Sequence, residues 1–386
     1  EADIISGGAG NDTLTGGDGT DSLTGGAGND TYKFNTNDVD TGETITEASS
    51  GGTDTISIVT TTDFANMSNA SFDEIEVINF GGASQTATFT GSQLTAETLS
   101  LTETVAGTSN LIVNVGSGTT TTFTNMTAAS SFTSGTDTVT INGTTGNETI
   151  TGPNIASTIS GGTGNDIITG GTQADIINGG DGADALVGGA GSDIYQFNTN
   201  DVDAGESITE AGSAGTDTVA IITTTDFTNM TVASFNEIEE IRFDGVNQTA
   251  TFTGAQLSSE TLLLKETSTG TSSIIVNVNA GQNTNFTAIT ADTFDSGTDI
   301  FTIAGTTGGE TILGPNIAST ISGGSGNDNI TGGNAADVIN GGNNNDTIDG
   351  NDGADTLTGG SGDDIYIFNT NDVDSGETIV EASSGG

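Results

Sequence analysis

The strongest constraint on this chain is a nine-residue phrase, G-G-x-G-x-D-x-(apolar)-x, which runs without interruption from Gly7 to Lys33. The phrase returns in two later blocks, and in each block its acid recurs at a fixed spacing. The repeated acids are Asp12, Asp21 and Asp30, then Asp166, Asp175, Asp184 and Asp193, then Asp328, Asp337, Asp346, Asp355 and Asp364. A fixed period this short predicts a solenoid, in which successive copies stack on one another.

The first half of the phrase predicts a tight turn that binds a cation. Glycines such as Gly8 and Gly10 adopt positive φ without steric cost, which leaves carbonyl oxygens free to point into the turn. Stacked turns would place Asp oxygens about 4.8 Å apart, or about twice that if alternate turns lie on opposite edges. Ca²⁺ fits best because it accepts six to eight oxygen ligands at about 2.3 to 2.6 Å with loose geometry, whereas Mg²⁺ requires a tight octahedron.

The second half of the phrase, D-x-(apolar)-x, predicts a short strand. Its apolar residue should point inward, because side chains alternate between the two faces of a strand. The residues expected to stack inside the solenoid are Leu14, Leu23, Ile168, Ile177, Leu186, Ile330, Ile339, Ile348 and Leu357. Tyr32, Tyr195 and Tyr366 each occupy the last strand of a block, and we expect them to cap the stack.

With these repeats the chain resembles the RTX family of calcium-binding β-rolls. Consecutive copies in phase make the match specific even in a chain with 60 glycines. The resemblance implies on the order of ten Ca²⁺ ions, held between turns by Asp carboxylates and backbone carbonyls. It implies metal sites formed by Asp3, Gly8, Gly10, Asp12, Gly17, Gly19, Asp21, Gly26, Gly28, Asp30, Gly162, Gly164, Asp166, Gly171, Asp175, Gly180, Gly182, Asp184, Gly189, Gly191, Asp193, Gly324, Gly326, Asp328, Gly333, Asp337, Gly342, Asp346, Gly353, Asp355, Gly360, Gly362 and Asp364.

Some copies depart from the phrase. Glu148 and Ser157 stand where Asp is expected in the second block, and Glu310 and Ser319 repeat these changes in the third. We expect these units to stack without a full set of calcium ligands.

A longer period lies over the short one. The phrase FNTNDVD begins at Phe34, Phe197 and Phe368, each time directly after a block. The chain therefore reads as a tandem array, whose two ends both fall within a repeat. The predicted segments are β-roll blocks at 1–34, 143–197 and 305–368, spacers at 35–142 and 198–304, and the start of a further spacer at 369–386.

The spacers are rich in Thr, Asn and Gly and contain β-type runs such as DTISIV, EIEVINF, TATFTG and LIVNV. Single helical turns are expected near 68–73 and 93–97. A wider parallel β-solenoid and an independent antiparallel sandwich both fit this pattern. We favour the solenoid because the spacer passes into TVTINGTTGNETITG without a linker. The predicted fold is all-β, with parallel β-roll blocks alternating with β-rich spacers that continue as a wider β-solenoid.

The spacers also contain acidic motifs. NTNDVDTGE could be a further calcium loop or a solvated acidic turn that caps the roll. Its acids are Asp38, Asp40 and Glu43, with counterparts Asp201, Asp203 and Glu206, and Asp372, Asp374 and Glu377. The GGTDTI-like acids, Asp54, Asp137, Asp217 and Asp299, are interpreted as single degenerate roll turns.

The charge of the chain indicates that folding depends on a metal. The formal net charge is −49, with only Lys33, Lys265 and Arg242 as cationic side chains. Such repulsion opposes compaction unless counter-cations bind where the acids stack, so disorder is expected without calcium. A permanently disordered tail is disfavoured because 31% of the residues are apolar and follow a β period.

The absence of Cys and His excludes disulfides, thiol chemistry and the usual zinc sites, and leaves calcium as the staple of an extracellular chain. No apolar run is long enough to span a membrane, and no basic cluster suits nucleic acid. The sequence contains no H-E-x-x-H and, lacking His, no serine triad, so we expect no enzyme.

The sequence thus predicts a calcium-stabilised, secreted structural protein. We expect it to form a surface layer, sheath or filament with other copies of itself, with cell-surface polysaccharide as a further partner. RTX relatives commonly leave the cell through a type I exporter. Two alternatives stay open: the calcium-rigidified stalk of a large adhesin, and the β-roll region of a secreted enzyme or toxin.

Overall fold

The computed structural model describes residues 1–47, 52–133, 135–210, 215–294, 298–370, 372–373 and 375–381. These residues form short β-strands almost throughout, and every recorded strand pair is parallel. The chain divides into a first compact unit, mainly residues 1–194, and a second, mainly residues 195–386. In the described part of the chain, no helix has the length and apolar character needed to cross a bilayer.

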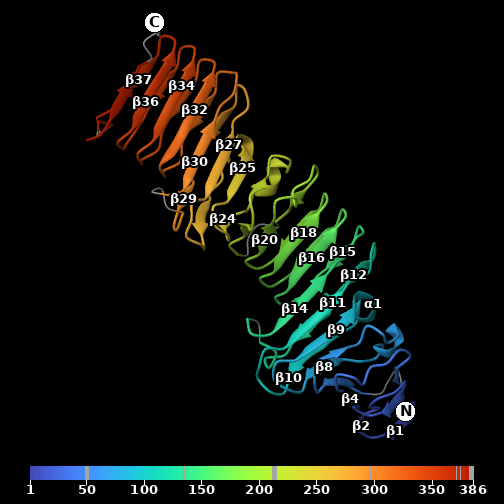
Figure 1. Cartoon of the computed structure of the whole chain (residues 1–386). Coiled ribbons are helices and arrows are strands. Elements are labelled where there is room, and N and C mark those ends of the chain that lie inside the picture. The colour runs from blue at the N-terminus through green and yellow to red at the C-terminus, as the bar shows by residue number, and fades with distance from the viewer. Residues whose placement is uncertain are drawn as a thin grey trace. The chain divides into compact units, whose positions relative to one another are not determined.

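The strands of the first unit lie in four parallel ladders (Figure 1). Their bounds, ladder by ladder, are β1 (Ile4–Ala9), β3 (Ser22–Ala27) and β5 (Thr44–Thr46); β2 (Thr13–Leu14), β4 (Thr31–Phe34), β6 (Thr55–Ile58), β8 (Val77–Phe80), β10 (Ser100–Glu103) and β13 (Thr127–Ala128); β7 (Thr62–Asp63), β9 (Thr86–Thr90), β11 (Asn110–Asn114), β14 (Thr138–Asn142), β16 (Thr158–Thr163) and β18 (Ile176–Asp181); β12 (Thr120–Thr122), β15 (Thr149–Thr151), β17 (Ile167–Gly171) and β19 (Ala185–Gly189).

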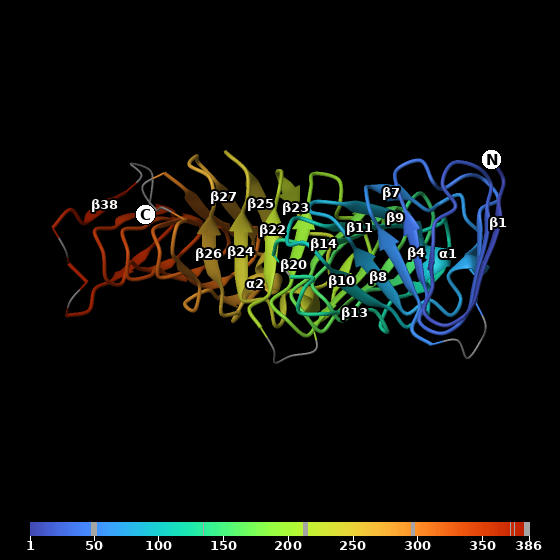
Figure 2. The same cartoon turned by 90° about the horizontal axis from the view of Figure 1, so that it is seen from below.

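The second unit is built in the same way, and Figure 2 shows β22, β24 and β26 side by side. The boundary between the two units falls within strand β20 (Ile194–Phe197), and β21 (Ser207–Ile208) follows it in the sequence. The remaining ladders are β22 (Thr218–Ile221), β24 (Glu240–Phe243), β26 (Leu263–Glu266) and β29 (Thr290–Ala291); β23 (Thr225–Asp226), β25 (Thr249–Thr253), β27 (Ser273–Asn277), β30 (Ile300–Ala304), β32 (Ser319–Ser325), β34 (Val338–Asn343), β36 (Thr356–Ser361) and β38 (Thr378–Val380); β28 (Asn283–Asn285), β31 (Thr311–Leu313), β33 (Asn329–Thr331), β35 (Thr347–Asp349) and β37 (Ile365–Ile367).

One turn of a roll contains two copies of the nonapeptide. Partners in neighbouring turns are 18 residues apart, as in the pairing of Ile159 with Ile177 and of Ile168 with Leu186. Consecutive copies therefore lie in different sheets, and copies of the same parity stack. All nine apolar residues predicted to point inward are at most 3% exposed, which confirms the period-two interpretation.

The spacers continue the same parallel stack with wider turns. In the first unit β4 of the roll pairs with β6 of the spacer, and β14 of the spacer pairs with β16 of the next roll. Residues that are hydrogen-bonded between neighbouring spacer turns are 22 to 30 residues apart in the sequence. The favoured solenoid is confirmed, and the antiparallel sandwich is excluded by the parallel register.

The wider spacer turns enclose clusters of three packed phenylalanine rings. In the first unit Phe64 and Phe89 stack with ring centroids 4.6 Å apart, and Phe72 meets both edge-on. The second unit repeats this cluster with Phe227, Phe252 and Phe235. The longer turn makes room for these rings.

The predicted helical turns are present as η1 (Asn69–Ser71) and α1 (Gly91–Leu94), with counterparts η2 (Val232–Phe235) and α2 (Gly254–Leu257). Helix α1 begins two residues earlier than predicted. The Thr90 N–H donates to Gln93 Oε1 at 2.7 Å, and Gln93 Nε2 donates to the Phe64 carbonyl at 2.8 Å. This capping arrangement fixes the start of the helix at Thr90.

For Tyr32 the predicted role of end cap is wrong. Its strand β4 pairs on one side with β2, where Leu14 faces it, and on the other side with β6, where Ile56 faces it. Tyr32 is fully buried in the middle of the stack. The core continues past the roll because the spacer supplies the next strand.

Candidate calcium sites in the roll turns

The repeated acids form a ladder of carboxylates along each unit. From Asp21 onward, one oxygen of each repeated Asp accepts the backbone N–H of the residue one turn earlier. The Asp12 N–H donates to Asp30 Oδ1 at 2.7 Å, and the Asp328 N–H donates to Asp346 Oδ1 at 2.8 Å. The same bond, at 2.7 Å, links the Asp3 N–H to Asp21, although the Asp3 side chain is exposed. The ladder arises because each Asp directly precedes a strand and its N–H points along the stack.

The second oxygen of many of these carboxylates is buried and has no hydrogen-bond partner. Most of the roll acids are at most 2% exposed. The unpartnered oxygens include Oδ2 of Asp12, Asp21, Asp30, Asp166, Asp328, Asp346 and Asp364. A buried anionic oxygen without a partner loses its hydrogen bonds to water, which costs roughly several kcal/mol of folding free energy. A row of such oxygens fits a row of cations.

The glycines bring backbone oxygens to the same edge. A Cβ on Gly161 or Gly323, the first glycine of a unit, would collide with Oδ2 of that unit's Asp. A Cβ on Gly180 would collide with the Gly162 carbonyl oxygen of the preceding turn. Only glycine permits this approach, so carbonyl oxygens of neighbouring turns stack beside the carboxylates.

The second and third glycines of the units have φ between 83° and 145°, which permits this turn. They are Gly8, Gly10, Gly17, Gly19, Gly26, Gly28, Gly162, Gly164, Gly180, Gly182, Gly189, Gly191, Gly324, Gly326, Gly342, Gly353, Gly360 and Gly362.

Two predicted metal residues, Gly171 and Gly333, form a different turn in which φ is not positive. Their units lack the third glycine. The Gly333 N–H then donates to Asp337 Oδ2 at 2.7 Å, and the Ser319 hydroxyl donates to Asp337 Oδ1 at 2.8 Å. In the Gly333 turn a backbone N–H thus donates to the Asp oxygen that is unpartnered in the complete units, whereas Asp175 Oδ2 in the Gly171 unit has no hydrogen-bond partner.

In the units with Glu or Ser in place of Asp, the substituted side chains also form hydrogen bonds within the protein. Glu148 Oε1 accepts the Gly118 N–H at 2.7 Å, and Glu310 Oε1 accepts the Gly281 N–H at 2.9 Å. The Ser157 hydroxyl donates to Asp175 Oδ1 at 2.8 Å. These contacts favour the prediction that such units stack with an incomplete ligand set.

The ladder passes beyond the rolls through acids that the nonapeptide pattern did not identify. The Asp21 N–H donates to Glu43 Oε2 at 3.0 Å, and the Asp54 N–H donates to Glu76 Oε2 at 2.7 Å. Glu76 directly precedes β8, just as a roll Asp precedes its strand, and this position is the signal that could have found it.

The GGTDTI-like acids have the geometry of ladder members. Asp54, Asp137 and Asp299 each accept a backbone N–H from the preceding turn at 2.8 Å. The Asp217 N–H donates to Glu239 Oε2 at 2.8 Å. Their interpretation as degenerate roll turns therefore agrees with the contacts.

In the motif NTNDVDTGE the three acids accept bonds from three different backbone donors. Asp38 Oδ2 accepts the N–H of Asn35 at 2.8 Å, and Asp40 Oδ2 accepts the N–H of Gly19 at 3.0 Å, while Glu43 joins the ladder. The third copy repeats the first contact between Asn369 and Asp372, and Asp374 lies outside the described residues. Glu43 Oε1 is buried without a hydrogen-bond partner, as in the roll acids, so the structural turn and the calcium loop both fit this geometry.

Burial raises the pKa of several ladder carboxylates. It raises the pKa of Asp166 and of Asp346 to about 6, and backbone N–H donors only partly offset this. Burial likewise raises the pKa of Glu43 to about 7, and the neighbouring Asp21 and Asp40 carboxylates add to the shift. The folded chain therefore holds these negative charges at a cost that bound cations would remove.

Comparison with known proteins identifies the repeat. A family model of the RTX calcium-binding nonapeptide repeat (4 copies) matches residues 1–32, 160–195, 305–337, 318–348 and 331–366. Neither curated proteins nor solved structures gave a match. The matched segments are those with the carboxylate and glycine geometry described above, and the spacers belong to the same stacks through their strand pairing.

Proposed function

Since the chain carries RTX calcium-binding nonapeptide repeats, we propose that it is a calcium-stabilised secreted structural protein that self-assembles into an extracellular filament, sheath or surface layer. One observation carries this proposal. Within each unit, roll and spacer strands share one parallel stack and one core, so the roll is no appendage of a separately folded domain. A β-solenoid is a structural type of fold, and we assign it no catalytic activity.

Calcium would act as the folding switch. The chain has 52 acidic residues against three basic ones, and the ladders place many of the acids in buried rows. Ions that bind only the folded state stabilise it by mass action, whereas low cytosolic calcium would leave the rolls loose. A loose chain is competent for export, and it would fold in the calcium-rich medium outside.

A surface for self-contact recurs at an equivalent position in both units. In the first unit a shallow hollow beside the ladder is lined by Thr138, Ala156 and Ile176. In the second unit the equivalent hollow is lined by Ile300, Ala318 and Val338, of which Val338 is 50% exposed. A small apolar hollow repeated once per unit suits repeated contacts between copies of the chain.

Negative-stain electron microscopy during a calcium titration, with EGTA added at the end, tests the proposal. We expect filaments or sheets that appear with Ca²⁺ and dissolve with EGTA. Val338→Asp should suppress assembly, while Asn340→Asp, which adds the same charge at an exposed position of the same strand, should not. Rods that stiffen with Ca²⁺ and never associate would refute self-assembly and point to an adhesin stalk.

A further inference from the structure

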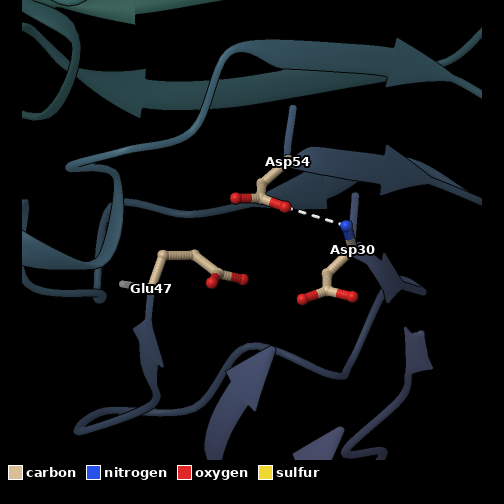
Figure 3. A group of neighbouring side chains, drawn as sticks. All are labelled: Asp30, Glu47 and Asp54. Carbon is tan, nitrogen blue, oxygen red and sulfur yellow. Dashed lines mark hydrogen bonds between the residues drawn. The ribbon is translucent and has the colours of Figure 1, made fainter. Parts of the chain in front are cut away.

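Three carboxylates converge where the first roll block meets the spacer. Asp30 belongs to the last complete nonapeptide, and Glu47 and Asp54 follow it in the spacer (Figure 3). One oxygen from each lies within 4.8 Å of the others. Asp30 and Asp54 are each 1% exposed, and Glu47 is half-buried. Three formal negative charges thus share a space with little access to water.

Asp30 points an unpartnered oxygen into this cluster. Its Oδ1 accepts the Asp12 N–H at 2.7 Å, and its Oδ2 is buried without a hydrogen-bond partner. Oδ2 and Glu47 Oε1 converge on Gly25, where a Cβ would collide with both. Figure 3 shows the Asp30 and Glu47 carboxylates facing each other below Asp54. Asp54 Oδ1 accepts the Asp30 N–H at 2.8 Å.

Glu47 is held in the cluster from the core side. The hydroxyl of Tyr32 donates to Glu47 Oε1, and the Gly26 N–H donates to Oε2 at 3.2 Å. Tyr32 is fully buried between Leu14 and Ile56, so its hydroxyl is fixed in place. Burial raises the pKa of Tyr32, which keeps its hydroxyl protonated as a donor.

We propose that Asp30, Glu47 and Asp54 form a calcium site that joins the roll to the spacer and differs from the sites within the nonapeptide turns. The inference rests on the proposed role of calcium in this chain. The segment before Asp54 reads S-G-G-T-D and lacks the third glycine of a complete unit, so Glu47 supplies an anionic oxygen instead. Ca²⁺ suits three carboxylates because it prefers hard oxygen ligands in flexible geometry.

The arrangement around Glu47 recurs in the second unit, where the hydroxyl of Tyr195 donates to Glu210. In both cases the Tyr ends a roll block and the Glu follows 15 residues later. A tyrosine in the last roll strand thus has a second role besides core packing: it positions a carboxylate of the following spacer.

Terbium luminescence tests the proposal on the full chain, because a tyrosine excites a Tb³⁺ ion bound near it. The chain has three tyrosines and no tryptophan. Replacing Tyr195 and Tyr366 by Phe leaves Tyr32 as the sole sensitiser. In this background Glu47→Gln should weaken the tightest luminescent Tb³⁺ binding on the order of 100-fold and lower the bound calcium, counted by equilibrium dialysis, by one ion. Glu74→Gln removes one charge at an exposed spacer position and serves as the control.

The outcomes separate this site from the general role of calcium. Superimposable Tb³⁺ titrations and equal ion counts for Glu47→Gln and Glu74→Gln would overturn the site while leaving the roll sites intact. If the circular dichroism spectrum of the wild type is the same with and without calcium, the proposed function is refuted. Should Glu47→Gln not fold, Tyr32→Phe keeps all three carboxylates but frees Glu47. Dialysis should then show the same ion bound about tenfold more weakly, and unchanged affinity would also overturn the site.

Discussion

The roll turns and the spacer turns share a strand direction and a carboxylate ladder, yet different forces stabilise them. A roll turn takes 18 residues and encloses little beyond one aliphatic side chain from each short strand. A spacer turn takes 22 to 30 residues and encloses phenylalanine clusters. We therefore expect the rolls to depend on neutralising their acids, whereas the spacers have a hydrophobic core of their own.

The largest expected effect comes from removing calcium. We expect EGTA to abolish amide protection in roll residues 143–197 and 305–368, while protection persists in the Phe-containing strands of the spacers. The reason is that most of the buried anionic oxygens without hydrogen-bond partners lie in the rolls. Hydrogen exchange followed by mass spectrometry measures both regions in one sample. Equal loss of amide protection in rolls and spacers would contradict the idea that different forces stabilise the two regions.

A cavity in the spacer core should be the next largest effect. Phe64→Ala removes the ring that contacts Phe34, Phe72 and Phe89, and should cost about 3–5 kcal/mol of unfolding free energy. Thermal unfolding at saturating calcium measures it. Phe368→Ala, at a position 39% exposed, is the control and should cost far less. A Phe64 variant that changes the calcium midpoint but not the melting temperature would contradict the assignment of the ring to the core.

Within the rolls, complete and incomplete glycine turns should respond differently. Asp328→Asn alters a carboxylate in a unit with all three glycines, whose Oδ2 is unpartnered, and should raise the calcium midpoint of folding on the order of tenfold. Asp337→Asn alters a carboxylate that accepts the Gly333 N–H, and should cost about 1 kcal/mol with little change in that midpoint. Calcium titration followed by circular dichroism compares the two, and equal midpoints would show that glycine pattern does not select the ions.

The smallest expected effect is on pH dependence in calcium-free buffer. The folded-state pKa values of Asp166 and Asp346 are about 6, above the unfolded value of 3.8, so the folded state binds protons more tightly. The strand signal of the rolls in circular dichroism should therefore increase as the pH falls from about 7 towards 4, because protons then replace part of the neutralisation that calcium provides. In saturating calcium the direction should reverse, because protons then compete with the ions. A calcium-free strand signal that falls over this range would refute the raised pKa values.

Much of the molecule follows from local pattern. The nine-residue phrase predicts the β-roll and the inward side chains, because the φ preferences of glycine and the alternation of a strand act within a few residues. The end-cap role of Tyr32 was wrong because the following strand, β6, comes from the spacer. Glu47 and Glu76 were missed as members of the carboxylate clusters, and Glu43 was predicted only within its own acidic motif, since the turns that bring these acids together have no fixed length.

The sequence by itself determined that the repeat blocks are parallel β-rolls of the RTX calcium-binding type, since short-range periodicity and a surplus of acids leave few other ways to fold. For the spacers it left a sandwich open, which the parallel register excluded. Only the tertiary structure decided which oxygens are buried without partners and which acids meet. Those facts depend on the register between strands 18 to 30 residues apart. That register is set by how many residues each turn must accommodate around the core, which no local pattern specifies.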